Sequence, residues 1–172
     1  WRRLAIDRLD LQPGWLVLDL ATGTGDLGLE ATGRREGVRV VGADLSTKMM
    51  RRGQQKVETA AAEMEFCCGD AERLPFPEST YDAMAIGFGV RNFGDLDTGL
   101  REMYRVLKPG GRLSVLEFSR PRAFFIRQVY LFYFQFVLPS LGRVISKDPL
   151  AYRYLFESVM TFPDGDAFLD RL

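Results

Sequence analysis

Short apolar runs alternate with amphipathic stretches along the first two thirds of the chain. The runs predict buried strands at 16–20, 38–42, 63–68, 81–86 and 112–118, each bounded by glycine, proline or polar turn residues. Helices are predicted between them, from a glycine cluster to about residue 35, from Ser46 as N-cap to about 61, and from Asp95 to Lys108. Strands that alternate with helices at this spacing predict a doubly wound α/β fold with a mostly parallel sheet.

The pattern changes after Pro121. Aromatic and aliphatic residues dominate 123–138, interrupted by Arg127, Gln128 and Gln135, so the segment is too short and too polar to span a bilayer. We expect a helix with an extended apolar face. That face either covers the sheet or forms a pocket wall or a membrane-contacting lid.

Composition and charge exclude several kinds of chemistry. The 172 residues include 23 basic and 23 acidic ones, which is typical of a globular domain and leaves no basic surface for nucleic acid. The chain has no histidine, so Ser-His-Asp catalysis and the commonest metal ligand are absent, and no metal is predicted. The two cysteines are adjacent, Cys67 and Cys68, which gives neither a disulfide framework nor a CxxC pattern and favours a reducing compartment.

A glycine-rich segment follows the first predicted strand. Gly23 and Gly25 begin a GxGxxG spacing, which alone would indicate a nicotinamide dinucleotide. Asp26, however, begins the next helix where a pyrophosphate would bind, and two like charges 4 Å apart repel by about 4 kcal/mol at a dielectric of 20. S-adenosylmethionine carries a sulfonium, an ammonium and no phosphate, so Asp19 and Asp26 favour it. The plainer alternative is that Asp26 only caps a helix and the glycines only make a turn.

Acidic residues also follow the next two strands. Asp44 can accept two hydrogen bonds from a ribose diol, a role that suits either cofactor. Asp70 is placed to accept from an adenine amino group while the Ala71 amide meets a ring nitrogen. Asp70 could equally be an ordinary turn residue.

Five segments carry a family resemblance: 19–26 (DLATGTGD), 69–76 (GDAERLPF), 87–93 (GFGVRNF), 99–118 (GLREMYRVLKPGGRLSVLEF) and 152–162 (YRYLFESVMTF). Together they resemble the ubiquinone/menaquinone biosynthesis C-methyltransferases over essentially the whole chain. Many class I methyltransferases share the glycine loop and the LKPGG turn. The GFGVRN, REMYRVLKPGGR and YxYLxxSV segments are specific to the quinone enzymes.

The resemblance implies a class I, Rossmann-like methyltransferase that uses S-adenosylmethionine. It implies methylation of a ring carbon of a reduced prenylated quinol, either demethylmenaquinol or the ubiquinol precursor, and cofactor contacts at Thr24, Asp44, Asp70 and Ala71. Some relatives have a contacting serine where this chain has Gly87. Members also carry an N-terminal helical segment and two further strands. We therefore expect one methyltransferase domain over 1–172, truncated at both ends and lacking the last strands, with 120–160 as an aromatic-rich helical insertion or lid.

The same resemblance suggests catalytic residues. A ring carbon becomes nucleophilic when the neighbouring hydroxyl loses its proton, and Arg91 can donate to that oxygen while Asn92 orients the quinol. Alternatively, Arg91 pairs with Asp19 or Glu117 as part of the scaffold.

The proton acceptor is a further prediction. Asp148 is a candidate base acting through water, and the phenol could instead ionise with help from Arg91 alone. Tyr152 and Tyr154 either hydrogen-bond to the quinol or only pack.

Partners and location follow from a quinol with a prenyl tail. We expect a cytoplasmic protein that contacts the inner face of the membrane peripherally through Phe124, Phe125 and Tyr130, with no nucleic-acid partner and with a homodimer left open. Two rival functions remain: an NAD-dependent oxidoreductase, and a non-catalytic protein of methyltransferase fold that binds quinones or partner proteins.

Overall fold

The computed structural model describes residues 1–119, 125, 128, 149–163 and 165–172. The chain divides into two units, Trp1–Glu117 and Phe118–Leu172, and each is described by itself.

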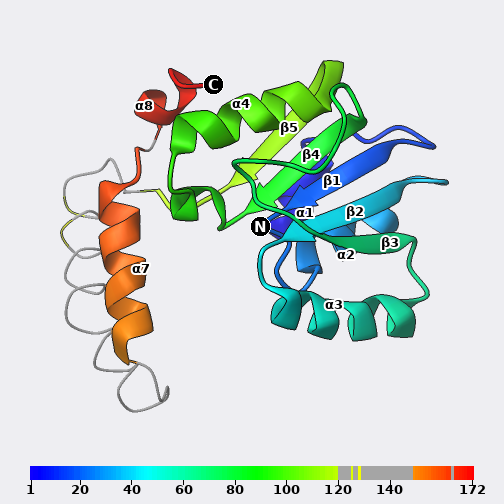
Figure 1. Ribbon diagram of the computed structural model, residues 1–172, viewed down its shortest axis with the longest axis horizontal. Helices are drawn as coiled ribbons and strands as arrows, with labels where there is room; N and C mark the ends of the chain where they lie inside the picture. The colour runs from blue at the N-terminus through cyan, green and yellow to red at the C-terminus, as the bar shows by residue number, and fades with distance from the viewer. Residues whose placement is uncertain (120–124, 126–127, 129–148, 164) are drawn as a thin grey trace. The chain divides into compact units, whose positions relative to one another are not determined.

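The first unit is built on a five-stranded sheet in the order β3-β2-β1-β4-β5 (Figure 1). The strands are β1 (Leu16–Leu20), β2 (Arg39–Asp44), β3 (Met64–Cys68), β4 (Tyr81–Gly87) and β5 (Leu107–Leu116). All neighbouring pairs are parallel, which confirms the predicted doubly wound fold. The chain order reverses between β1 and β4, where such sheets form a crevice at the carboxyl ends of the strands.

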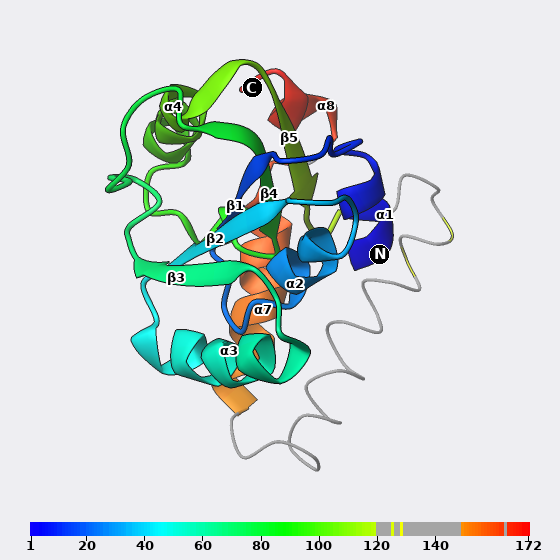
Figure 2. The ribbon, with the colours of Figure 1, turned by 90° about the vertical axis from the view of Figure 1, so that its right-hand side faces the viewer.

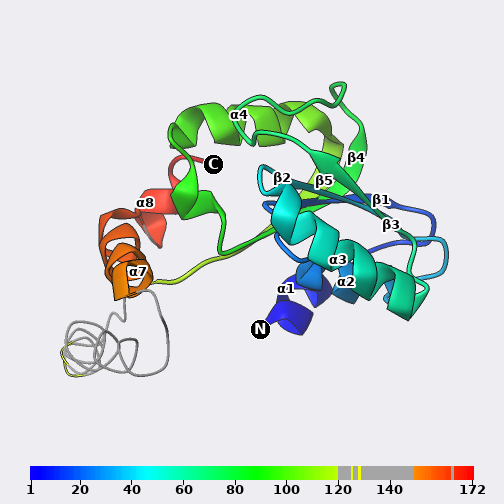
Figure 3. The ribbon, with the colours of Figure 1, turned by 60° about the horizontal axis from the view of Figure 1, so that its bottom comes forward.

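Helices cover both faces of this sheet. They are α1 (Arg2–Asp7), α2 (Asp26–Thr32), α3 (Thr47–Ala60) and α4 (Leu96–Val106), with a 3-10 turn, η1, at Val90–Asn92. Figure 3 shows α1, α2 and α3 on one face and α4 on the other, and Figure 2 shows α2 and α3 together beside β2 and β3. The predicted N-cap of α3 is confirmed, because the Ser46 hydroxyl accepts a hydrogen bond from the Met49 amide at 3.4 Å.

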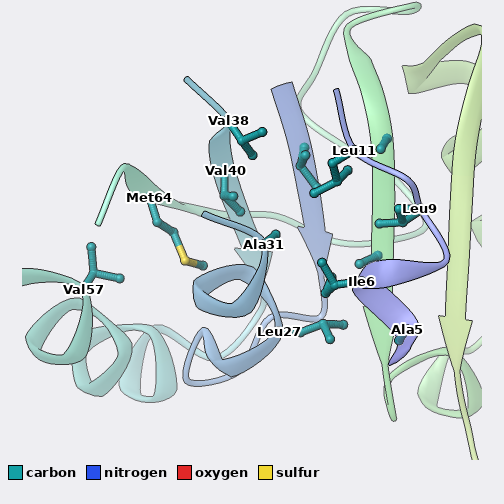
Figure 4. Packing of buried hydrophobic residues seen from close by; sticks show 13 residues of the cluster. Ala5, Ile6, Leu9, Leu11, Leu27, Ala31, Val38, Val40, Val57 and Met64 are labelled. Carbon is teal, nitrogen blue, oxygen red and sulfur yellow. The ribbon is translucent and has the colours of Figure 1, made fainter. Parts of the chain in front are cut away.

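The main core lies between the sheet and the helices α1 and α2, which cover one of its faces. Ile6 of α1 and Leu27 and Ala31 of α2 pack toward the strands, beside Val40 of β2 (Figure 4). Burying one such aliphatic side chain contributes roughly 1.5–3 kcal/mol, so this apolar layer is a main source of the stability of the sheet.

The sequence prediction differs from the structure at the end of α4. That helix ends at Val106 rather than Lys108, and β5 begins at Leu107 rather than Arg112. The intervening Lys108 to Gly111 forms a bulge opposite Tyr81 and Ala83, with Gly110 at a φ of +77°. The spacing of apolar residues along the sequence cannot reveal a bulge, because the bulged residues interrupt the alternation of side chains between the two faces of the sheet. The short α1 was not predicted either.

The second unit contains α7 (Pro149–Thr161) and α8 (Asp166–Leu169). The ring centroid of Phe162, which directly follows α7, lies 5.3 Å from that of Phe168 in α8. The predicted aromatic helix at 123–138 lies outside the described residues, except for Phe125 and Gln128. Within the part of the chain that the structure describes, no helix is both long enough and apolar enough to cross a membrane.

Candidate functional site

The loops that follow β1 to β4 surround a cleft of about 1070 Å³ at the carboxyl ends of the strands. Ligands bind at this edge in doubly wound sheets. The lining includes most of the predicted site residues, namely Asp19, Gly23, Thr24, Asp26, Asp44, Asp70, Ala71 and Asn92. Gly25 and Arg91 belong to the same loops but are not among the described residues that line the cleft.

Asp44, the last residue of β2, anchors the glycine loop. Its Oδ2 accepts a hydrogen bond from the Gly23 amide at 2.8 Å, and its Oδ1 accepts one from the Ser46 amide at 2.7 Å. An ionised carboxylate has about four acceptor positions, so each oxygen can accept another hydrogen bond. Asp44 can therefore hold the loop and bind a vicinal diol at the same time.

Asp19 lies at the base of the cleft and is only 1% exposed. Its Oδ2 accepts hydrogen bonds from the Thr22 hydroxyl at 2.5 Å and the Gly28 amide at 2.8 Å. Burial raises the pKa of Asp19 to about 7, and the two hydrogen bonds offset only part of that rise. Asp19 therefore changes charge near neutral pH, and a cation bound beside it would favour the ionised form.

Asp26, the first residue of α2, is already paired with basic side chains. Its Oδ1 lies 2.8 Å from Lys56 Nζ, and its Oδ2 lies 3.1 Å from a nitrogen of Arg2. The Thr24 hydroxyl donates to Asp26 at 3.2 Å and accepts from Lys56 at 2.9 Å. Partial burial alone would raise the pKa of Asp26, but these contacts outweigh it and lower the pKa. The repulsion expected between Asp26 and a diphosphate is therefore weaker than the sequence suggests.

The loop after β3 is held by two residues of α4. The Leu74 amide donates to Glu102 at 2.7 Å, while Arg105 donates to the carbonyls of Leu74 at 3.1 Å and Phe76 at 2.7 Å. Glu102 and Arg105 also form a bidentate ion pair with both N–O distances at 2.7 Å. This clamp accounts for an acid and a base three residues apart in the REMYR segment.

Glu72 connects the loops after β3 and β4. Its carboxylate accepts a hydrogen bond from the Gly94 amide at 2.6 Å, and its own amide donates to Asp70 Oδ1 at 2.9 Å. Asp70, Ala71 and Glu72 all line the cleft. The predicted adenine contacts are thus tied to the wall formed by the next loop.

The described lining of the cleft is acidic. Carboxylates come from Asp19, Asp26, Asp44, Asp70 and Glu72, whereas the basic side chain in the lining is Arg2. With Asp26 already paired, the excess negative charge comes mainly from the loops after β2 and β3. An acidic, glycine-lined cleft favours a cationic adenosyl compound over a diphosphate.

Comparison with known proteins assigns the family. The sequence profile of the ubiE/COQ5 methyltransferase family matches residues 1–172. This chain belongs to that family. It is 49% identical over 167 residues to the demethylmenaquinone methyltransferase of Thermus thermophilus, a match that covers 97% of this chain and 76% of that protein. It is 44% identical over 171 residues to the ubiquinone/menaquinone biosynthesis C-methyltransferase UbiE of Geotalea daltonii, covering 98% and 72%.

Solved structures support the fold. The SAM dependent methyltransferase from Aquifex aeolicus matches with a TM-score of 0.63 and 21% identity over 72% of this chain and 66% of that one. The [4+2]-cyclase SpnF matches with a TM-score of 0.66 and 29% identity over 71% and 45%. Because a cyclase shares the fold, the fold alone does not decide the reaction.

Within this family member, Arg91 is part of a buried ion pair. Its Nη1 lies 2.6 Å from Glu117 Oε1 and donates at 2.7 Å to the carbonyl of Phe88, and the Arg91 and Glu117 side chains are 10% and 7% exposed. The sequence left open a partner for Arg91 at Asp19 or Glu117, and the structure places it at Glu117. The role of Arg91 at a quinol oxygen stays a prediction.

The predictions for Asp148, Tyr152 and Tyr154 concern the second unit. Asp148 and the side chain of Tyr152 lie outside the described residues. Tyr154 lies on α7 and is 55% exposed. The roles proposed for these residues stay predictions.

Sequence reasoning missed several residues that shape the cleft. Lys56 and Arg2 contact the glycine loop but stand in none of the family segments, and Glu72, which joins two loops, stands in segment 69–76 without having been assigned a role. The acid–base pair of Glu102 and Arg105, three residues apart on one helix, was the one signal available. In the described part of the chain, no group of three or more His, Cys, Asp or Glu residues could hold a metal ion.

Proposed function

We propose that this chain transfers a methyl group from S-adenosylmethionine to a ring carbon of a reduced prenylated quinol in quinone biosynthesis. The observation that carries the proposal is the match over the whole chain to a family whose relatives are named as quinone methyltransferases. The acidic cleft at the strand ends agrees with a cationic donor.

The residues around the cleft fit this cofactor. Asp44 accepts from the ribose diol, and Asp70 with the Ala71 amide recognises the adenine edge. The loop of Gly23, Thr24 and Gly25 approaches the methionine end. The buried Asp19 carboxyl lies beneath this loop, and the bound cation favours its ionised form. The bound cofactor supplies an electrophilic methyl group, while the chain supplies orientation and excludes water.

The acceptor meets the loop after β4. Phe88, Phe93 and Leu116 give this part of the lining an apolar surface suited to an aromatic ring, and Asn92 offers an amide that can orient a quinol hydroxyl. The proton of that hydroxyl leaves to a base acting through water, for which Asp148 is the candidate, or the phenol ionises with help from Arg91 alone. Both demethylmenaquinol and the ubiquinol precursor are proposed acceptors.

The prenyl tail calls for contact with lipid, so peripheral association with the inner face of the membrane is part of the proposal. Phe125 is 82% exposed, as a lipid-contacting side chain would be. Cosedimentation with anionic liposomes should detect the contact, and Phe125→Ala together with Phe124→Ala should weaken it. Undiminished sedimentation of the double variant would remove these side chains from the membrane contact.

Transfer of labelled methyl from S-adenosylmethionine tests the function directly. The assay offers reduced demethylmenaquinol and the benzoquinol analogue separately, with calorimetric titration of S-adenosylmethionine and NADH alongside. We expect labelled product and binding of S-adenosylmethionine. Cofactor binding without product from either quinol would favour the non-catalytic alternative, and binding of NADH alone would favour the oxidoreductase.

A further inference from the structure

The loop after β4 leaves its strand in a strained conformation. Phe88 directly follows Gly87, the last residue of β4, and has a φ of +57°. A bulky L residue rarely adopts this φ because its Cβ crowds the backbone, and such strain persists only where surrounding contacts impose it. Phe88 also lines the cleft, so the strain lies at the site.

The end of β5 holds both main-chain polar groups of Phe88. The Phe88 amide donates to the Leu116 carbonyl at 2.8 Å. The Phe88 carbonyl accepts from Arg91 Nη1 at 2.7 Å, and the same nitrogen donates to Glu117 at 2.6 Å. Because Leu116 and Glu117 are consecutive, one short segment determines both ends of the strained residue.

The Arg91–Glu117 ion pair is better explained by its hold on Phe88 than by a contribution to the stability of the fold. A buried ion pair rarely stabilises a fold more than apolar side chains of the same volume would, because both charges lose their water. A guanidinium nitrogen carries two hydrogens in a fixed plane, so it can bind a carboxylate and a carbonyl together. Glu117 neutralises the charge that this arrangement brings into the interior.

We propose that Glu117 is a positioning residue for methyl transfer, which acts through Arg91 to hold Phe88 in its left-handed conformation and so sets the Phe88–Asn92 wall that faces the acceptor. Asn92 belongs to this wall because its amide donates to the Gly89 carbonyl at 3.0 Å and its side chain reaches the Phe88 carbonyl at 3.5 Å. The inference rests on the proposed function.

Substitution of Glu117 should impair turnover of the quinol without changing the affinity for the cofactor. Glu117→Gln leaves the buried Arg91 guanidinium without its charged partner and so weakens its hold on the Phe88 carbonyl. We therefore expect kcat/KM for the quinol to fall about 100-fold, the loss that a displacement of about 1 Å produces. The dissociation constant of S-adenosylmethionine should stay unchanged, because Asp44 and Asp70 are held by hydrogen bonds of their own.

A matched control exists at the opposite end of the same two strands. Asp82 of β4 lies 2.6 Å from the Lys108 ammonium of β5, at the edge of the sheet away from the cleft. Asp82→Asn also removes a carboxylate that pairs β4 with β5. It should lower the urea midpoint while leaving kcat/KM unchanged.

A double-mutant cycle with Phe88→Gly tests whether Glu117→Gln lowers kcat/KM through the conformation of Phe88. Glycine adopts positive φ without strain, so in the Phe88→Gly background Glu117→Gln should lower kcat/KM only a few-fold. If Arg91 instead donates to the quinol oxygen itself, the loss stays about 100-fold in both backgrounds, and the proposal is overturned. Arg91→Lys, which keeps a positive charge opposite Glu117, gives the same test if Glu117→Gln does not fold.

Amide hydrogen exchange supplies a readout that needs no substrate. In Glu117→Gln the Phe88 amide should exchange faster while the Gly23 amide, held by Asp44, keeps its rate. Equal protection of Phe88 in both proteins would overturn the inference. A wild-type protein that methylates neither quinol would refute the proposed function, whereas an active wild type with no coupling in the cycle would refute only the positioning role.

Discussion

The loops after β1 and β4 both begin at a residue with a positive φ, but they differ in the kind of side chain that holds their main chain. Each turns directly at a strained residue, Ala21 at a φ of +52° and Phe88 at +57°. In the first loop, carboxylates accept hydrogen bonds from main-chain amides, as Asp44 does from Gly23. In the second, the Arg91 guanidinium donates to a main-chain carbonyl.

Under the proposed function, this difference lets one edge of the sheet accommodate two unlike molecules. Loops held by carboxylates leave negative charge beside the cleft, which suits a cationic donor. A loop held by a guanidinium that Glu117 neutralises leaves apolar rings and an amide, which suits a quinol. The experiments below alter one loop at a time, starting from the largest expected effect.

The pH dependence of stability should reveal Asp19. Its pKa of about 7 in the fold exceeds that in the unfolded chain, about 3.9, so the folded state binds the extra proton between these values. Stability changes by up to about 1.4 kcal/mol for each pH unit in that window and by less at its two ends, so raising the pH from 4 to 7 should remove roughly 3 kcal/mol of the contribution of Asp19. Other carboxyls titrate over the same range in both proteins, so the difference between the urea-unfolding free energies of the wild type and Asp19→Asn should shift by this amount between pH 4 and pH 7.

Asp95 serves as the control for that experiment. Hydrogen bonds from Thr98 lower the pKa of Asp95, so Asp95 is ionised in both states above pH 5. Wild-type and Asp95→Asn curves should therefore run parallel from pH 5 to 8. If the stability curve of Asp19→Asn also ran parallel to that of the wild type, burial would not raise the pKa of Asp19.

Cofactor affinity should depend most on Asp44. Asp44→Ala removes the hydrogen bonds to the Gly23 and Ser46 amides together with the proposed bonds to the ribose. Bonds to a charged group contribute roughly 1.5–3 kcal/mol each, so we expect a loss of about 3 kcal/mol, or about 100-fold, in the dissociation constant measured by calorimetry. Asp44→Asn keeps one acceptor and should lose about tenfold. Full affinity in the alanine variant would exclude Asp44 from the cofactor site.

The contact between the two loops can be broken at Gly89. A Cβ placed there would lie 2.4 Å from the Ala21 Cβ, so Gly89→Ala should destabilise the protein by about 2 kcal/mol and lower Tm by roughly 4–8 °C. At Gly33 nothing lies within 4 Å of an added Cβ, so Gly33→Ala should leave Tm unchanged or raise it slightly. Adding Ala21→Gly to Gly89→Ala should restore much of the loss, and its failure to do so would mean that the two loops do not compete for this space.

The sequence predicted the sheet better than the ends of its elements. β1 matches the predicted residues, and the N-cap at Ser46 is confirmed, because apolar runs and capping residues are local signals. The bulge around Gly110 and the short helix α1 escaped prediction because they depend on strand pairing and on packing against distant residues.

The sequence predicted which acidic residues lie at the cleft, but not which side chains they contact. Asp44 and Asp70 could be placed at the cleft because the carboxyl ends of parallel strands meet at one edge. The partners of Asp26 could not, because Lys56 and Arg2 lie on separate helices and carry no motif. The partner of Arg91 could only be narrowed to two acids, since β4–β5 register decides which one it meets.

The smallest effect expected is that of Lys56→Met, which tests the charge of the β1 loop. The pair with Asp26 is nearly half exposed, and such pairs contribute about 0–1 kcal/mol, so stability should change little. Removing the ammonium leaves Asp26 less neutralised, so S-adenosylmethionine should bind up to about threefold tighter at low salt, an advantage that about 1 M salt removes by screening. Lys48→Met, on the same helix and exposed, is the matched control and should leave affinity unchanged. Weaker binding by Lys56→Met would show that Lys56 matters for holding Thr24 rather than for the charge of the cleft.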